Sequence, residues 1–386
     1  MTLEAEIGEP QWVFGQSRYA FLDGGRIALA YGRDGFDHLA VWDGARLHTL
    51  ELPYSSVHSV VAQGDEVLFI GASPSAEPAL VKLRLDGVRV AESRVVRPPR
   101  NLGLDAEWFS RPEPMRFPSA DGRTCHALFY PPRSPTHEGP AGERPPLLVF
   151  IHGGPTSAAA PTLQLGIQYW TSRGFAVVDV NYGGSTGYGR AYRELLKGSW
   201  GVVDVQDCEA AARHLAQAGR VDPARLCIRG GSAGGYTTLA ALAFGDTFAA
   251  GASHFGVADL EALASDTHKF ESRYLDGLIA PWPAQREVYR GRSPIHHLDR
   301  FDKPLAVFQG LEDRVVPPNQ AEMIVDALRK KGVPVAYVPF EGEQHGFRQA
   351  KNIRRALDGE LSFYAQIFGI PLPPEEGIEP VRIENL

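Results

Sequence analysis

From about residue 117 to the C-terminus, short apolar runs alternate with segments of helical periodicity. The run 147–152 is continuously apolar, as expected of a strand that is buried on both faces. Alternation of this kind predicts an α/β domain with a mostly parallel sheet and helices on both faces. The expected strands are 147–152, 176–181, 226–229, 249–254, 305–309 and 335–339, and the expected helices are 204–218, 235–244, 319–331 and 351–368.

Residues 19 to about 96 show a different pattern, with short β-type runs broken by Gly, Asp and Pro. Asp-Gly dipeptides stand where hairpins would reverse the chain. The runs form two sets of four that match at an offset of about 40 residues, which is the period of a β-propeller blade. An ordinary antiparallel sheet is the alternative interpretation. The runs are 19–22, 26–31, 38–43, 47–52, 59–62, 66–71, 79–85 and 88–93.

Two blades on their own pose a physical problem, because about three or more repeats are normally needed to bury the faces of a stack. The region therefore resembles the end of a propeller, either truncated or completed by another chain. Pro-rich segments at 97–101 and 112–118 mark a boundary. We expect two domains, a β-rich partial propeller at 1–111 and an α/β domain at 112–386.

Composition excludes several classes of protein. Lys and Arg number 39 against 46 Asp and Glu, a net charge of −7 without a basic block, which disfavours nucleic-acid binding. Cys125, Cys208 and Cys227 are too widely spaced to predict a disulfide framework or a zinc site. No apolar stretch approaches the roughly 18 residues of a membrane span. With an acidic N-terminus that is unlike a signal peptide, we expect a cytoplasmic protein with no membrane partner.

The pattern G-x-S-x-G occurs twice, as GGSTG at 183–187 and GGSAG at 230–234. Its mechanical meaning is a sharp strand-to-helix turn that lifts a serine hydroxyl above the sheet. Ser232 follows the strand LCIR and opens the apolar helix GYTTLAALAF, whereas Ser185 leads into a looser, polar stretch. We therefore predict Ser232 as the nucleophile. A simple tight turn is the alternative for either serine.

A serine needs a base and a group that orients the base. In α/β-hydrolases the acid and the histidine follow the serine along the chain. Asp313 lies just after the expected strand 305–309, and His345 lies on a Gly-flanked loop after the last expected strand. Both positions fall at the carboxyl ends of strands, where open α/β sheets build their sites. Glu312 and Asp302 are the competing acids.

The oxyanion of an acyl-transfer reaction needs preorganised N–H donors. One is expected to be the backbone N–H of Ala233, the residue after the nucleophile. The other is expected from the loop HGGP at 152–155, which has the form of the donor loop of lipases and esterases.

Six motifs in order resemble the catalytic domain of the prolyl oligopeptidase family of serine peptidases, in particular its acylaminoacyl-peptidase and dipeptidyl-aminopeptidase-like bacterial members. The likeness spans about 117–369 and implies an α/β-hydrolase fold. In this family an N-terminal propeller screens the site and admits only short peptides. The motifs are HGGP, NYGGSTGYGR, GGSAGGY, THKFESRYL, QGLEDRVVPPNQ and GEQHGF.

The resemblance implies that Ser232 is the nucleophile, His345 the general base and then acid, and Asp313 the orienting carboxylate. The N–H groups of Gly154 and Ala233 would form the oxyanion hole.

The sequence departs from the family pattern at three points. His152 stands where some relatives have a Tyr whose hydroxyl is an oxyanion donor, which favours a backbone donor here. Val315 occupies the place of an Arg that holds a substrate carbonyl in oligopeptidase-type relatives, with Arg314 one position earlier. Most of the propeller is also missing, together with any acidic residues there that would bind a free N-terminus.

The expected function is hydrolysis of short peptides by acyl transfer, with no cofactor and no metal. A carboxylesterase acting on small esters is one alternative, and an inactive truncated remnant or binding scaffold is another. Because a partial propeller exposes strand edges and apolar faces, we also expect a homo-oligomer formed through it.

Overall fold

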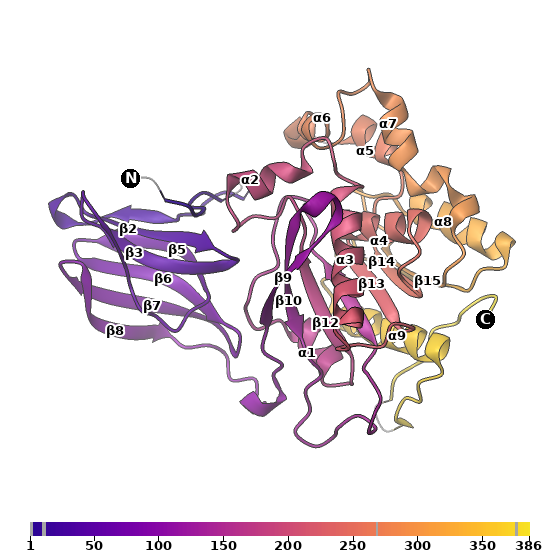
Figure 1. The fold of residues 1–386 in the computed structure, drawn as a ribbon, viewed down its shortest axis with the longest axis horizontal. Helices are drawn as coiled ribbons and strands as arrows, with labels where there is room; N and C mark the ends of the chain where they lie inside the picture. The colour runs from indigo at the N-terminus through magenta and orange to yellow at the C-terminus, as the bar shows by residue number, and fades with distance from the viewer. Residues whose placement is uncertain (1–2, 10–12, 268, 375–376) are drawn as a thin grey trace.

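The computed structural model describes residues 3–9, 13–267, 269–374 and 377–386 (Figure 1). The described strands form two four-stranded sheets and one eight-stranded sheet. The two small sheets lie together on one side of the molecule, and the large sheet with its helices forms the other side.

The two N-terminal sheets are antiparallel and run in chain order, as the repeat predicts. Because successive side chains of a strand point to opposite faces, alternate apolar residues meet between the sheets, among them Val41, Phe69 and Val81. The first sheet is β1 (Tyr19–Phe21), β2 (Ile27–Arg33), β3 (Phe36–Trp42) and β4 (Leu47–Thr49). The second is β5 (Ser56–Gln63), β6 (Glu66–Ser73), β7 (Ala76–Asp86) and β8 (Arg89–Arg97).

The N-terminal segment covers the opposite face of the first sheet. Leu3, Ala5 and Ile7 pack in a cluster that contains Leu29 of β2. The Glu6 N–H donates to the Gly32 carbonyl at 2.9 Å, and the Gly32 N–H donates to the Glu6 carbonyl at 2.7 Å. The apolar face that a preceding blade would cover is therefore partly buried by this segment.

The large sheet has the order β16-β15-β14-β13-β11-β12-β10-β9. Strands β11 to β16 pair in parallel, while β10 pairs antiparallel with both β9 and β12. The mostly parallel sheet is confirmed, and β9 and β10 are additions that the alternation did not predict. The strands are β9 (Glu113–Pro118), β10 (Thr124–Tyr130), β11 (Leu147–Ile151), β12 (Ala176–Asn181), β13 (Leu226–Gly231), β14 (Ala250–His254), β15 (Leu305–Gly310) and β16 (Val335–Phe340).

Helices cover both faces of this sheet, as expected. On one face lie α3 (Val203–Gln217), α4 (Ala233–Phe244) and α8 (Pro318–Lys331), and on the other α1 (Leu165–Thr171) and α9 (Ala350–Phe368). Shorter helices occupy the connections, namely α2 (Arg190–Arg193), α5 (Leu260–Asp266), α6 (Tyr274–Leu278) and α7 (Arg286–Arg292). Within the described ranges, none of the helices combines the length and the hydrophobicity needed to cross a membrane.

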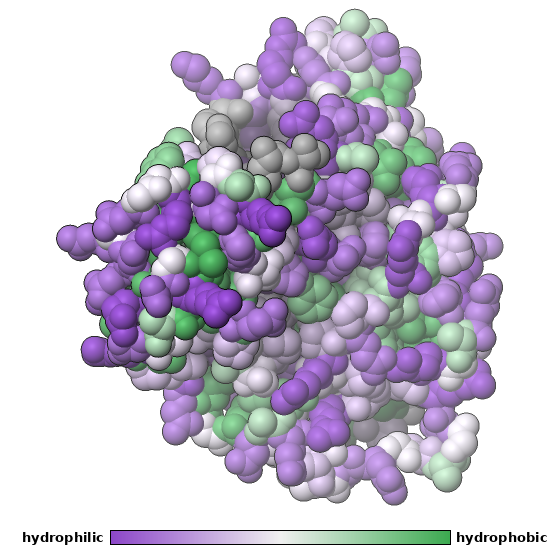
Figure 2. Space-filling model, turned by 60° about the vertical axis from the view of Figure 1, so that its left-hand side comes forward, coloured by the Kyte–Doolittle hydropathy of each residue, from purple (hydrophilic) through white to green (hydrophobic). Residues whose placement is uncertain are grey.

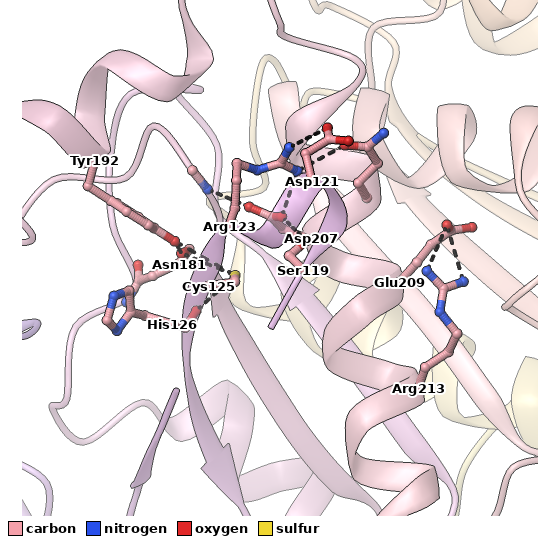
Figure 3. A network of polar contacts seen from close by, with 12 residues as sticks. Ser119, Asp121, Arg123, Cys125, His126, Asn181, Tyr192, Asp207, Glu209 and Arg213 are labelled. Atoms are coloured by element: carbon pink, nitrogen blue, oxygen red, sulfur yellow. Dashed lines mark hydrogen bonds and ion pairs between the residues drawn. The ribbon is translucent and has the colours of Figure 1, made fainter. Parts of the chain in front are cut away.

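A buried carboxylate joins the hairpin β9–β10 to α3. Figure 3 shows Ser119 and Arg123 pointing toward Asp207. Asp207 accepts hydrogen bonds from the Ser119 hydroxyl, from Arg123 at 3.2 Å and from the Gly183 N–H at 2.8 Å. The edge of the sheet and the loop after β12 are thus tied to one helix.

Because of the buried carboxyl group of Asp204, also on α3, we expect the free energy of unfolding to depend on pH. Asp204 is fully buried and accepts hydrogen bonds from the Thr237 hydroxyl (2.6 Å) and the Gly201 N–H (2.7 Å). Burial raises the pKa of Asp204 from 3.8 to about 6, because these hydrogen bonds only partly offset the loss of hydration. Its protonated form is therefore favoured by folding, and this contribution is lost as pH rises through about 6.

We expect Asp204→Asn to become more stable relative to the wild type, by about 2 kcal/mol, as pH rises from 4 to 7.5. Urea unfolding of both proteins across this range measures the difference. A difference that does not vary with pH would contradict the prediction.

Candidate active site

Ser232 lies at the turn between β13 and α4, in a backbone conformation that is rare for a residue with a side chain. Its φ is 55° and its ψ is −119°. The Ser232 N–H donates to the His254 carbonyl of β14 at 3.0 Å, which fixes the turn against the neighbouring strand. This is the sharp strand-to-helix geometry that the second GGSAG motif predicts.

The structure brings Ser232, His345 and Asp313 into one hydrogen-bonded row. His345 Nε2 lies 2.8 Å from Ser232 Oγ, and His345 Nδ1 lies 2.8 Å from Asp313 Oδ2. Because a carboxylate only accepts, Nδ1 carries the hydrogen, and Nε2 is left to accept the serine proton. The three side chains come from turns at the carboxyl ends of β13, β15 and β16.

Asp313 is held in place by its own turn. Its side chain is buried, and Oδ1 accepts the N–H groups of Val315 and Val316 at 2.8 and 2.9 Å. Gln309 donates to Oδ2 at 3.4 Å. The competing acid Glu312 is exposed. Val315, which stands in the position of the Arg of some relatives, supplies a backbone N–H to the carboxylate.

Glu343 anchors the loop that carries His345, and sequence reasoning did not identify it. Its side chain is only 2% exposed and accepts the N–H groups of Arg348 and Gln349, both at 2.9 Å, and the Asn352 amide at 2.8 Å. Burial alone would raise the pKa of Glu343, but these hydrogen bonds outweigh it and hold the pKa below its usual value. The charged form is therefore the one that fits the loop.

Residues 152–157 contain the expected oxyanion donor Gly154, and we call them the oxyanion loop for that reason. They pass close to Ser232. A Cβ on Gly153 would lie 3.9 Å from Ser232 Cβ. Gly154 has a φ of 119°, and a Cβ there would lie 2.6 Å from Thr156 N, so this position requires glycine. Ala233 begins α4, where the first N–H groups have no acceptor within the helix.

An aromatic wall flanks the histidine. The ring of Phe255 lies edge-on to His345, with 5.1 Å between centroids, and is perpendicular to Phe347 at 5.3 Å. Phe255 has a φ of 39° and follows β14 directly. No sequence motif identified this residue, because its position depends on how β14 ends.

A buried ionic cluster lies next to the turn that carries Ser232. Glu360 of α9 is fully buried and accepts from Arg229 of β13 at 2.9 and 3.1 Å, and it contacts His254 Nε2 at 2.8 Å. Burial alone would raise the pKa of Glu360, but the Arg229 charge and His254 hold it below its usual value. Helix α9 thereby ties together the two strands that carry Ser232 and its hydrogen-bond acceptor.

The other G-x-S-x-G serine occupies a different environment. Ser185 is fully buried, and its Oγ lies 2.8 Å from Nε2 of His152. Ser232, in contrast, contacts His345. Within the described residues, Asp259, Glu261 and His296 are the one group of side chains close enough to hold a metal ion. Glu261 already pairs there with Arg286, so we assign no metal to it.

The parallel sheet and the serine turn define an α/β-hydrolase fold, and the Ser–His–Asp row has the arrangement found in the serine hydrolases of that fold. The sequence model of the prolyl oligopeptidase family matches residues 161–371. The chain belongs to the prolyl oligopeptidase family, whose members are serine peptidases.

Similar proteins support this assignment over different lengths. Dipeptidyl aminopeptidase BIII of Pseudoxanthomonas mexicana is 30% identical over 316 residues, which are 79% of this chain and 45% of that protein. The acylamino-acid-releasing enzyme of Arabidopsis thaliana is 30% identical over 53% of this chain and 28% of its own length.

Two solved structures match nearly the whole chain. A puromycin hydrolase is 42% identical with a TM-score of 0.93, covering 99% of this chain and 57% of its own. A puromycin-hydrolyzing peptidase of Mycobacterium tuberculosis is 44% identical with a TM-score of 0.93, covering 100% and 58%. The match therefore covers 57–58% of these two structures and 28–45% of the two relatives above. Both the expected family and the expected fold class are confirmed.

The anchoring role of Glu343 leads to a stability prediction. We expect Glu343→Gln to lower the free energy of unfolding by about 1–3 kcal/mol, because the new amide would face N–H donors that need an acceptor. Chemical unfolding at pH 7 measures the loss. Glu341→Gln is the matched control, since Glu341 is exposed on the same loop. Equal stabilities of the two variants would contradict the anchoring role.

Proposed function

We propose that this chain is a serine peptidase that hydrolyses short peptides through an acyl-enzyme intermediate. The observation that carries the proposal is the row of two 2.8 Å contacts from Asp313 through His345 to Ser232. Ser232 is the nucleophile, His345 the general base and then acid, and Asp313 the group that orients His345.

In the first step, Ser232 Oγ attacks the scissile carbonyl carbon while His345 Nε2 takes the hydroxyl proton. The backbone N–H groups of Gly154 and Ala233 hold the negative oxygen of the tetrahedral intermediate. His345 then gives its proton to the leaving amine as the acyl-enzyme forms. Water repeats the sequence and releases the acid. The scheme uses no metal and no organic cofactor.

The names of the relatives support a peptide substrate over a simple ester. They include a dipeptidyl aminopeptidase and acylamino-acid-releasing enzymes. We transfer to this chain only what these names share, which is cleavage next to an amino acid. The two small sheets of the described N-terminal region lie beside the large sheet. In our proposal they limit the size of the substrates that reach Ser232.

The first test combines a fluorophosphonate probe with a panel of peptide amides and p-nitrophenyl esters. We expect the wild type to label at Ser232, as mapped by mass spectrometry, and to cleave peptide amides. Ser232→Ala should lose both properties, with turnover reduced by about 10⁶-fold. If the wild type is labelled but cleaves only esters, the chain is a carboxylesterase and not a peptidase. A wild type that neither labels nor turns over would identify an inactive remnant.

We further propose that residues 1–111 and 112–386 are separate domains and that the first mediates self-association. The edge strands β1 and β5 of the two small sheets expose apolar side chains, including Phe21 (70% exposed) and Val61 (52%). Figure 2, which brings this side of the molecule forward, shows apolar groups among the charged ones. Exposed strands and apolar patches favour association.

We expect light scattering in the micromolar range to give the mass of a dimer or larger assembly, and Phe21→Ser to shift it toward the monomer. The matched control is Val96→Ser on the edge strand β8, since Val96 is 42% exposed in the other small sheet. A monomeric mass for the wild type throughout this range would refute self-association.

A further inference from the structure

The loop after β12 carries the G-x-S-x-G motif that the triad does not use, yet its serine is one of the buried polar residues of the molecule. Ser185 Oγ contacts His152 Nε2 at 2.8 Å. His152 is the first residue of the oxyanion loop, 33 residues away in sequence. A serine in a motif of this form is therefore directed at the loop that holds Gly154.

The direction of the proton in this contact follows from the other contacts of His152. Nδ1 lies 2.9 Å from the Gly153 carbonyl, which can only accept, so Nδ1 carries the hydrogen. Burial lowers the pKa of His152 to about 4, so the ring is neutral at neutral pH and Nε2 is an acceptor. Ser185 is thus the donor, and removing its hydroxyl leaves Nε2 of His152 without this partner.

Further contacts from Tyr182 and Thr186 join the same loop to the oxyanion loop. The Tyr182 hydroxyl donates to the Pro155 carbonyl at 2.7 Å, and its ring stacks on His152 with 4.4 Å between centroids. The Thr186 N–H donates to the Ser157 carbonyl at 2.9 Å. These contacts bracket Gly154 on both sides along the chain.

The N-terminal region holds the opposite side of this loop. The Gly187 N–H donates to Glu6 Oε2 at 2.7 Å, and Glu6 also pairs with Arg193 of α2. The Gly35 N–H, at the tip of the β2–β3 hairpin, donates to the Gly187 carbonyl at 3.4 Å. Residues 182–187 therefore lie between the N-terminal sheet β1–β4 and the oxyanion loop, with hydrogen bonds to both.

We infer that residues 182–187 position the oxyanion loop, and that Ser185 is a positioning residue that keeps the Gly154 N–H aimed at the developing oxyanion. The inference rests on the proposed function of Ser232. Removing a donor from an oxyanion hole costs about 10²–10³ in kcat, and a donor that is only misplaced loses part of that. The effect belongs to the transition state, because the ground-state carbonyl depends less on the same N–H.

The test is Ser185→Ala in the full chain, assayed with the best peptide amide from the panel and with a matching peptide aldehyde. The aldehyde probes the oxyanion hole because Ser232 O–H adds across its C=O bond, and the new C–O group occupies that hole. We expect kcat to fall by about 10- to 100-fold, the inhibition constant of the aldehyde to rise by a similar factor, and KM to change by less than about 3-fold. Rates are divided by the concentration of sites that a fluorophosphonate labels.

Tyr182→Phe is the second variant, because it removes one hydroxyl from the same support and preserves the ring that stacks on His152. We expect the same parallel loss of kcat and of aldehyde affinity. Ser172→Ala is the control, since that hydroxyl donates to the Tyr169 carbonyl at the end of α1. It should leave both constants unchanged.

Three results would overturn the inference. In the first, the rate per labelled site and the aldehyde affinity stay at wild-type values in both variants. In the second, only the number of labelled sites falls, which assigns Ser185 to folding alone. In the third, the wild type neither labels nor turns over, and the proposed function fails together with the inference that rests on it.

Discussion

The site depends on how closely the chain approaches itself around Ser232. A Cβ on Gly230 would lie 2.4 Å from the Gly234 carbonyl oxygen, and a Cβ on Gly234 would lie 2.5 Å from the Ile151 carbonyl oxygen. These are backbone atoms of β11 and α4, so no side-chain rearrangement relieves the contact. The first turn of α4 is therefore pressed between two strands. In this arrangement Ser232 caps the N-terminus of α4 directly after β13.

Buried carboxylates supply the second constraint, because loops at the carboxyl edge of the sheet cannot hold their shape by apolar packing alone. Asp313 satisfies two backbone N–H groups of its own turn, Glu343 satisfies two more on the histidine loop, and Asp207 satisfies Gly183 on the loop after β12. Each acid replaces the water that these donors would otherwise bind. A set of separate loops thus becomes one preorganised surface, which electrostatic catalysis requires.

The sequence predicts those parts of the fold that leave a pattern in neighbouring residues of the chain. The buried strands and the long helices follow from periodicity, and the contacts among Ser232, Asp313 and His345 follow from motifs placed after strands. Glu360 has no such signal, since it is one acid on a helix and its partner Arg229 lies 131 residues away. The antiparallel strands β9 and β10 also lack this signal, because no α-helix lies between them in the chain.

The two G-x-S-x-G motifs show why a local pattern does not determine the role of its serine. Ser232 is followed at once by α4, so its turn is braced by a helix and its hydroxyl is held above the sheet. After Ser185 the chain runs through Gly187 and Gly189 before α2 begins at Arg190, and the serine turns inward to His152. What differs is the element that follows each motif. The same five-residue pattern therefore directs one serine to His345 and the other to His152 of the neighbouring loop.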